Sequence, residues 1–193
     1  MVKLNTSKNI ILGSKSPRRI ELLKLMNLTF QVQRIDVDES YPKSLSPIQT
    51  AIFLSKKKAK AYTIKKNDIL ICADTIVYAN KVILGKPKSK KNAKEMLSQM
   101  SNKRHFVVTG VTIKTIEKEI SFHEKSIVYF KKLSNQEIDF YVNNHKPFDK
   151  AGGYGIQDWI GVIGIYKIIG SFYNVMGLPT SKLYEKIIKL TCN

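Results

Sequence analysis

Cysteine is scarce in this 193-residue chain, which contains only two. Cys72 stands in an apolar run typical of a buried strand, and Cys192 is the second-last residue. This spacing fits neither a metal site nor the paired pattern of a disulfide-rich secreted domain. We therefore expect both cysteines to be reduced thiols.

Long hydrophobic runs are also missing. The longest apolar stretches, such as residues 160–165, fall well short of the roughly 20 residues that a membrane-spanning helix needs. Residues 1–9 do not have the pattern of a secretory signal peptide. With 43% hydrophobic and 25% charged residues, the composition is typical of globular domains. We expect a cytoplasmic protein without a membrane partner, folded as a single domain over residues 1–193.

Arginine is rare, although the chain carries a formal net charge of +18. Only four of the 33 basic residues are arginines, and the lysines are scattered among isoleucines and asparagines. These three residue types share adenine- and thymine-rich codons, so part of the excess can reflect mutational bias. A nucleic-acid-binding surface gathers its basic residues on one face. We therefore expect no specific nucleic-acid partner.

Apolar strand-like runs alternate with amphipathic helical stretches, which predicts an α/β domain. The expected strands are 9–13, 29–34, 68–78, 81–84, 105–116 and 119–131. The expected helices are 16–26, 46–64, 89–100, 134–144 and 180–190. Ser46 and Ser134 each begin a capping box. Seven of the ten glycines lie between Gly152 and Gly177, where the backbone must adopt positive φ or approach another group closely.

The segment from Ser14 to Arg19 is the first candidate site. It leads from the first expected strand into the first expected helix, where free amides, the helix dipole and two guanidinium groups can receive phosphate oxygens. It is not a Walker A loop, because the glycine spacing is absent. The alternative is an ordinary helix capped by Ser16 with two solvated arginines.

Asp74 is the second candidate, because it lies within the otherwise apolar run 69–77. Burying a carboxylate costs several kcal/mol unless it is paired, hydrogen-bonded or bound to a cation, so Asp74 needs a partner. The acidic loop 36–39 can supply a second carboxylate if the second strand ends beside the third. Two such carboxylates suit Mg²⁺ carried in on substrate phosphates. The alternative is that Asp74 only fixes a loop amide or pairs with one lysine.

Lysines in tight turns are the third candidates. Lys86 stands between glycine and proline, and Lys150 precedes a glycine-rich run, so both are better placed to meet an anion than lysines on a helix surface. The helix over 46–64 is expected to expose four lysines: Lys56, Lys57, Lys58 and Lys60. The three histidines lie far apart, fit no metal-binding spacing and are expected to be structural.

Taken together, these segments resemble the Maf family of nucleoside triphosphate pyrophosphatases, from Ile10 to about Leu183. The motifs that carry the resemblance occur in order: Ser14-Lys15-Ser16-Pro17-Arg18-Arg19, Asp74-Thr75, Gly85-Lys86-Pro87, Thr109-Gly110-Val111, Asp149-Lys150-Ala151-Gly152, Tyr154-Gly155-Ile156-Gln157 and the run 170–179. Lys15 replaces a commonly small residue, and Thr180 stands where an aliphatic residue is usual. Neither departure touches a residue with an implied chemical role.

The resemblance implies an α/β fold like that of inosine triphosphate pyrophosphatase, with a mixed central sheet, flanking helices and two lobes around an active-site cleft. It implies a homodimer that hydrolyses a nucleoside triphosphate between the α and β phosphates. The run around Lys150 and Gln157 resembles the branch that prefers dTTP and UTP, rather than the branch that acts on 7-methyl-GTP.

The motifs and the resemblance together assign roles to single residues. The expected catalytic residues are Asp74, Glu39, Lys58 and Lys86. The expected substrate-binding residues are Ser14, Ser16, Arg18, Arg19, Thr75, Lys150 and Gln157. Asp74 and Glu39 are expected to hold Mg²⁺ or Mn²⁺ and to orient water at the α-phosphorus. Whether Asp74 is a base or mainly a metal ligand stays open, because both roles need the same ionised carboxylate.

A second function class is a septum-formation or cell-division regulator, or a polyanion-binding protein without significant turnover. The charge of +18 and the family's association with inhibition of septum formation motivate it. It predicts clustered arginines with interleaved aromatic residues, which the sequence lacks. Release of pyrophosphate from dTTP by substoichiometric protein distinguishes the two classes.

Overall fold

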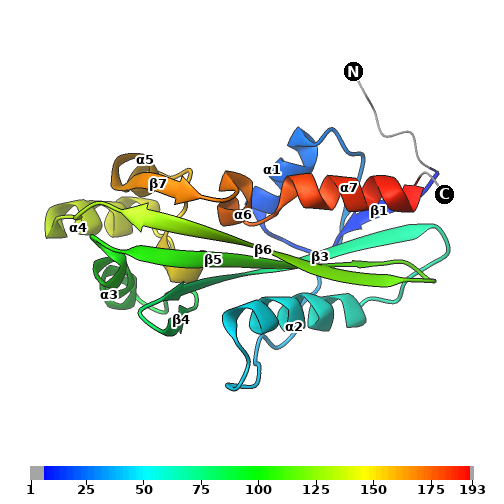
Figure 1. The fold of residues 1–193 in the computed structure, drawn as a ribbon, viewed down its shortest axis with the longest axis horizontal. Helices are drawn as coiled ribbons and strands as arrows, with labels where there is room; N and C mark the ends of the chain where they lie inside the picture. The colour runs from blue at the N-terminus through cyan, green and yellow to red at the C-terminus, as the bar shows by residue number, and fades with distance from the viewer. Residues whose placement is uncertain (1–6, 192–193) are drawn as a thin grey trace. The chain divides into compact units, whose positions relative to one another are not determined.

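The computed structural model describes residues 7–191, so Cys192 and most of the segment 1–9 lie outside it. The chain forms two compact units. The first consists of the chain up to Asp74, Thr109–Glu124 and the stretch from Gly177, and the second consists of Thr75–Val108 and Lys125–Met176. Each unit is therefore built from segments that are far apart in the sequence (Figure 1).

Within residues 7–191, seven strands form one sheet in the order β2-β1-β3-β5-β6-β7, with β4 paired to β3. Their bounds are β1 Asn9–Leu12, β2 Gln31–Val32, β3 Asp68–Ala79, β4 Val82–Leu84, β5 Arg104–Lys114, β6 Glu119–Phe130 and β7 Ile165–Ile169. β1 is parallel to β2 and β3, whereas β4 is antiparallel to β3 and β7 is antiparallel to β6. The predicted mixed central sheet is confirmed.

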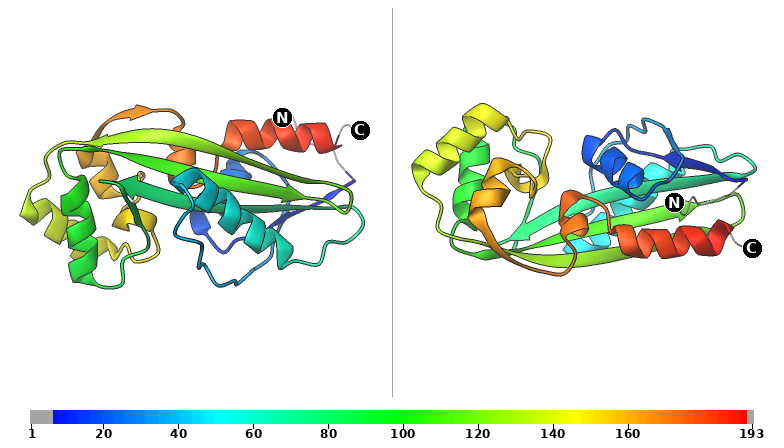
Figure 2. Two further views of the ribbon diagram at one scale, coloured as in Figure 1. Left: turned by 60° about the horizontal axis from the view of Figure 1, so that its bottom comes forward. Right: turned by 90° about the horizontal axis from the view of Figure 1, so that it is seen from above.

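The helices of the first unit flank its strands. They are α1 (Pro17–Leu25), α2 (Pro47–Lys60) and α7 (Thr180–Thr191). α2 packs on β5, where the hydroxyl oxygens of Ser55 and Thr112 are 2.8 Å apart. α7 packs on β6, where the Lys186 ammonium lies 5.0 Å from the centre of the Phe122 ring. Figures 1 and 2 show α2 and α7 on opposite sides of these strands.

α2 ends four residues before the predicted end at residue 64. The Lys114 ammonium donates to the carbonyls of Ala59 and Tyr62, each at 3.2 Å, and so satisfies acceptors at the helix end. Beyond the helix, Tyr62 and Ile64 pack against the buried cluster that contains Cys72. Cys72 is a free thiol, as predicted, and burial raises its pKa to about 12.

The second unit contains four helices among its described residues. They are α3 (Lys90–Met100), α4 (Asn135–His145), α5 (Trp159–Gly164) and α6 (Phe172–Met176), with a 3₁₀ turn at Ala151–Gly153. Its core includes Tyr154, whose ring centre lies 5.3 Å from that of His105 and 5.2 Å from that of Phe130. The Tyr154 hydroxyl is 2.7 Å from His105 Nε2. Burial lowers the pKa of His105 to about 4.

The sequence predicted most elements up to residue 145. Both capping boxes, at Ser46 and Ser134, are present. Ser16 is the N-cap residue of α1, but its side chain makes no capping hydrogen bond, so the alternative of a helix capped by the Ser16 hydroxyl is wrong. The second strand is confirmed only as Gln31–Val32, and α5, β7 and α6 were not predicted. Across residues 7–191, no helix has the length and apolar character needed to cross a membrane.

Candidate active site

The loop between β1 and α1 is shaped by the Ser14 hydroxyl. It accepts a hydrogen bond from the Ser16 amide at 3.2 Å and one from the Arg19 guanidinium at 3.4 Å. Pro17 is the first residue of α1, where its missing N–H costs no helical hydrogen bond. The Ser16 hydroxyl does not cap the helix, and the dipole at a helix N-terminus favours an anionic ligand.

Arg19 fixes the strand that carries Asp74. Its Nε donates to the Gly177 carbonyl at 2.9 Å, and its Nη1 donates to the Ala73 carbonyl at 2.8 Å. Burial lowers the pKa of Arg19, and the charge of Asp74 opposes this shift. Because Ala73 directly precedes Asp74, the buried guanidinium positions the backbone next to the carboxylate. The neighbouring Arg18 is half-buried.

Asp74, Lys58 and Glu39 form the carboxylate–lysine cluster. The Lys58 ammonium contacts the Asp74 carboxylate, and its Nζ lies 3.0 Å from Glu39 Oε1. The side chains of Lys58 and Asp74 are each 12% exposed, whereas that of Glu39 is 47% exposed. The prediction that Asp74 needs a partner is confirmed. The expectation that Lys58 lies on the exposed face of its helix is wrong, because the lysine turns toward the two carboxylates.

Gly110 allows α2 to lie close enough to β5 for Lys58 to reach Asp74. A Cβ at Gly110 would lie 2.4 Å from the carbonyl carbon of Ala51 and 2.4 Å from its oxygen, so the helix backbone leaves no room for a side chain. The bond between Ser55 and Thr112 fixes the same contact one helical turn further along. The Thr109-Gly110-Val111 motif is thus part of the support for the cluster.

Glu39 reaches the cluster from the loop after β2. The sequence predicted this arrangement on the condition that the second strand ends beside the third, but β1 lies between them. The loop is held to α2 by two adjacent lysines, because Lys57 pairs with Asp38 at 3.2 Å and Lys58 pairs with Glu39. Hydrogen bonds from Ser40, and then from Lys57, hold the pKa of Asp38 below its usual value.

In the second unit, Lys86 and Lys150 stand in two turns that are joined by a backbone hydrogen bond. The Gly152 amide donates to the Gly85 carbonyl at 3.0 Å. Gly152 has a φ of +71°, and a Cβ there would lie 3.0 Å from a methyl carbon of Val77. A glycine is therefore needed where the turn of Lys150 packs against Val77.

Asp158 is a charged residue near this turn that the sequence analysis missed. The Lys150 ammonium lies 2.8 Å from an oxygen of Asp149 and 3.6 Å from an oxygen of Asp158. The Tyr141 hydroxyl donates to Asp158 at 2.6 Å. Burial, and then the bond to Asp158, raises the pKa of Tyr141. The preceding residue, Gln157, is exposed. The position of Asp158 directly after this predicted site residue was the signal in the sequence that could have identified it.

The predicted site residues fall into two groups, one in each unit. The first unit holds Ser14, Ser16, Arg18, Arg19, Glu39, Lys58 and Asp74. The second unit holds Thr75, Lys86, Lys150 and Gln157. Thr75 follows Asp74 directly in β3 and is half-buried, whereas Lys86 is exposed. The structure brings Glu39, Lys58 and Asp74 into contact in the first unit, and in the second unit it joins the turns that carry Lys86 and Lys150.

Comparison with known proteins identifies the family. A family model described as Maf-like protein matches residues 9–190. The chain belongs to the Maf family. A relative from Parabacteroides distasonis is 47% identical over 92% of this chain and 94% of its own length. Relatives from Cytophaga hutchinsonii and Thermosipho africanus are each 49% identical, over 94% and 91% of this chain and 84% and 90% of their own lengths. All three are named dTTP/UTP pyrophosphatase.

A likeness to solved structures is weaker. The Ham1 protein of Staphylococcus aureus has a TM-score of 0.42 and 18% identity, covering 64% of this chain and 72% of its own. This likeness adds nothing to the family assignment. The Maf family resemblance drawn from the motifs is confirmed by the family model and the relatives.

The carboxylates of Asp74 and Glu39 have the oxygen donors that a divalent metal such as Mg²⁺ takes. Asp74 and Glu39 both reach a single cationic point, the Lys58 ammonium, so their oxygens can converge on one cation. Within residues 7–191 no group of three or more histidine, cysteine or acidic side chains could hold a metal alone. Mg²⁺ commonly takes one or two protein carboxylates and completes its shell with water and substrate phosphates.

Proposed function

We propose that the protein hydrolyses dTTP and UTP between the α and β phosphates, releasing the nucleoside monophosphate and pyrophosphate. The observation that carries this proposal is the carboxylate–lysine cluster within a chain of the Maf family, whose relatives at 47% and 49% identity are named dTTP/UTP pyrophosphatase. A phosphoanhydride hydrolase needs a group that orients water and cations that neutralise the phosphates. The cluster provides both kinds of group.

The cationic residues bind the triphosphate. Arg18 and the N-terminal end of α1 attract phosphate oxygens, because the helix dipole and a guanidinium both favour anions. Lys58, Lys86 and Lys150 add positive charge, and Lys150 is 14% exposed, so its charge is screened less than that of a solvated lysine. Ser14 and Arg19 hold the loop in shape. Stabilising the charge that develops on the phosphates accelerates the displacement.

Asp74 orients the attacking water and accepts its proton, or holds the metal beside it. The Asp74 side chain is 12% exposed, and it is fixed by Arg19 through the preceding carbonyl and by Lys58 directly. Asp74 and Glu39 would together hold Mg²⁺ or Mn²⁺. Such a metal lowers the pKa of bound water and polarises phosphate oxygens.

Gln157 selects the base. Its amide offers one acceptor and two donors, which match the imide edge of thymine and uracil, where a carbonyl lies beside an N–H. Cytosine presents a different pattern. Arg18 and Thr75 assist at positions that the family links to base choice. A base whose hydrogen-bonding edge is left unpaired by Gln157 should be discriminated against by about tenfold to a hundredfold.

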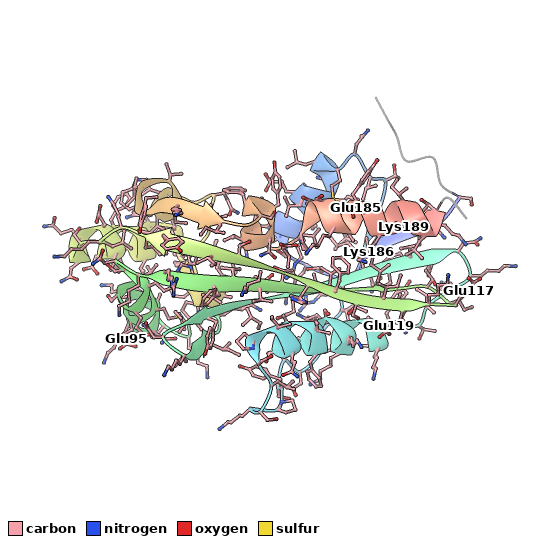
Figure 3. All side chains as sticks on the ribbon, viewed as in Figure 1. Glu95, Glu117, Glu119, Glu185, Lys186 and Lys189 are labelled. Carbon is pink, nitrogen blue, oxygen red and sulfur yellow. The ribbon has the colours of Figure 1, made fainter. Side chains whose placement is uncertain are left out.

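The proposal includes a homodimer and no specific nucleic-acid partner. The lysines are interspersed with acidic residues on the described surface, as on α7, where Figure 3 shows Glu185 with Lys186 and Lys189. Such scattered lysines support weak, salt-sensitive contacts with polyanions and no base readout. Tight, sequence-dependent DNA binding at physiological salt would contradict this part of the proposal.

Pyrophosphate release from a panel of nucleoside triphosphates tests the proposed activity. Purified protein at substoichiometric concentration is incubated with dTTP, UTP, CTP, ATP or GTP in Mg²⁺ or Mn²⁺. We expect many turnovers with dTTP and UTP and poor turnover with the others. Absence of turnover across the panel would favour the alternative of a regulator or polyanion-binding protein.

A further inference from the structure

One ammonium group lies where two carboxylates converge. The Lys58 Nζ is in contact with Asp74 and lies 3.0 Å from Glu39 Oε1. Two carboxylates close enough to share one ammonium repel each other unless a cation lies between them. The two carboxylates therefore form a position for one cation, and the Lys58 ammonium occupies it.

The Lys58 ammonium is positioned by α2, and the cluster around it is open to solvent on one side. Lys58 lies in the last turn of α2, where the helix dipole favours positive charge. The contact of Gly110 with Ala51 fixes the helix. Glu39 is 47% exposed and lies on a loop, so the cluster is open to solvent on the side of Glu39.

We propose that Lys58 is a built-in counter-cation that keeps free divalent metal away from Asp74 and Glu39 until a metal–triphosphate complex arrives. Lys58 then moves to the phosphate oxygens, and the metal takes its place between the carboxylates. A lysine suits this exchange because its ammonium is a point charge on a flexible stem. The inference rests on the proposed function in one respect, namely that Asp74 and Glu39 hold the metal.

Lys57 offers a matched control for charge. It precedes Lys58 on the same helix and pairs with Asp38 of the same loop at 3.2 Å. Its side chain is 32% exposed, and that of Asp38 is 73% exposed, so this pair is screened by water. Lys57→Met and Lys58→Met thus remove the same charge from adjacent positions, and only Lys58→Met vacates the place between the two carboxylates.

Binding of Mn²⁺ without nucleotide tests the inference, with electron paramagnetic resonance used to count free Mn²⁺. We expect Lys58→Met to bind Mn²⁺ about tenfold or more tightly than the unmodified protein, because a full charge in direct contact is removed. Lys57→Met should stay within about threefold, because its pair is exposed. Lys58→Arg retains the charge and should bind as weakly as the unmodified protein. Equal tightening in Lys57→Met and Lys58→Met, or none in Lys58→Met, would overturn the inference.

Thermal unfolding gives a second readout, in which each protein is compared with itself with and without Mn²⁺, so a lower starting stability of Lys58→Met is taken into account. Without a cation, Lys58→Met leaves two carboxylates facing each other, so Mn²⁺ should raise its melting temperature more than that of the unmodified protein. Adding Glu39→Gln to Lys58→Met should remove most of this gain. An equal rise for Lys58→Met and the unmodified protein would count against the inference.

Turnover of dTTP by the unmodified protein is measured in parallel and tests the proposed function separately. Turnover combined with unchanged Mn²⁺ binding in Lys58→Met would refute the counter-cation and leave the proposed function standing. Tighter Mn²⁺ binding in Lys58→Met without any turnover would support the counter-cation and refute the proposed function.

Discussion

The two groups of predicted site residues are held in place in different ways. In the first unit, Lys58 and Asp74 lie on a helix and a strand, and the close contact at Gly110 sets the helix position. In the second unit, Lys150 and Gln157 lie in or beside a glycine-rich turn. Lys58 and Asp74, which are proposed for the chemistry, are therefore fixed by core packing. Gln157, which is proposed for base choice, is carried by a loop, which can vary without disturbing the core.

The largest expected effect is the loss of turnover when Asp74, in the first unit, is replaced. Asp74→Asn keeps the shape of the side chain and removes the charge that a metal or the attacking water needs. We expect kcat for dTTP to fall by about 10²-fold or more while the protein stays folded. Steady-state pyrophosphate release and circular dichroism measure the two quantities.

Asp68 provides the control for Asp74→Asn. It is 5% exposed in the same strand, and it accepts from the Tyr62 hydroxyl at 3.3 Å and the Lys65 amide at 3.1 Å. Asp68→Asn should lower stability with little change in kcat. If Asp74→Asn retains most of its kcat, the catalytic carboxylate has been assigned to the wrong residue.

The next expected effect is on the packing that fixes α2. Gly110→Ala places a methyl group 2.4 Å from the Ala51 backbone, and such overpacking costs typically about 1–3 kcal/mol. We expect a melting temperature lower by about 2–10 °C and a lower kcat, because Lys58 moves with the helix. Gly85→Ala in the second unit is the control, since a Cβ there has no neighbour within 4 Å. Equal melting temperatures for the two variants would contradict this account.

The sequence was most informative where local chemistry decides the structure. The capping boxes at Ser46 and Ser134 marked the starts of α2 and α4, because the serine and the residue three positions later bond to each other's backbone. The need of Asp74 for a partner followed from burial alone. The identity of that partner did not follow from the sequence. Lys58 reaches Asp74 only because Gly110 packs against Ala51, which is 59 positions earlier in the chain.

A smaller effect is expected on base choice in the second unit. Gln157→Glu replaces the two amide donors with acceptors, so dTTP and UTP should lose about tenfold in kcat/KM relative to CTP, ATP and GTP. Gln136→Glu, at an exposed position of α4, controls for the added charge. An unchanged order of preference in Gln157→Glu would mean that Gln157 only braces the turn.

The glycine-rich part of the second unit was the hardest to predict. The apolar run 160–165 is divided between α5 and β7, because neither its length nor its periodicity indicates where a helix gives way to a strand. A Cβ at Gly161 would lie 2.1 Å from the Ile156 carbonyl oxygen, and only the folded chain shows this approach. The ion pair of Lys150 with Asp158 depends on the same turn.

The smallest expected effect is a pH dependence of stability that originates in the second unit. Burial lowers the pKa of His105 from 6.5 to about 4, and His105 Nδ1 has no hydrogen-bond partner among residues 7–191. The unfolded chain therefore binds a proton at His105 before the folded protein does. Stability should fall as the pH falls from 6.5 toward 4, by about 1 kcal/mol between pH 7 and pH 5.5 from this residue.

Urea unfolding at pH 7 and at pH 5.5 measures this loss of stability. His105→Gln, which can still bond to Tyr154, should reduce the loss by that amount, whereas His123→Gln, at a half-buried position of β6, should not. If His105→Gln loses as much stability as the unmodified protein over this range, His105 is not the group that titrates, and the pH dependence has to come from elsewhere in the molecule.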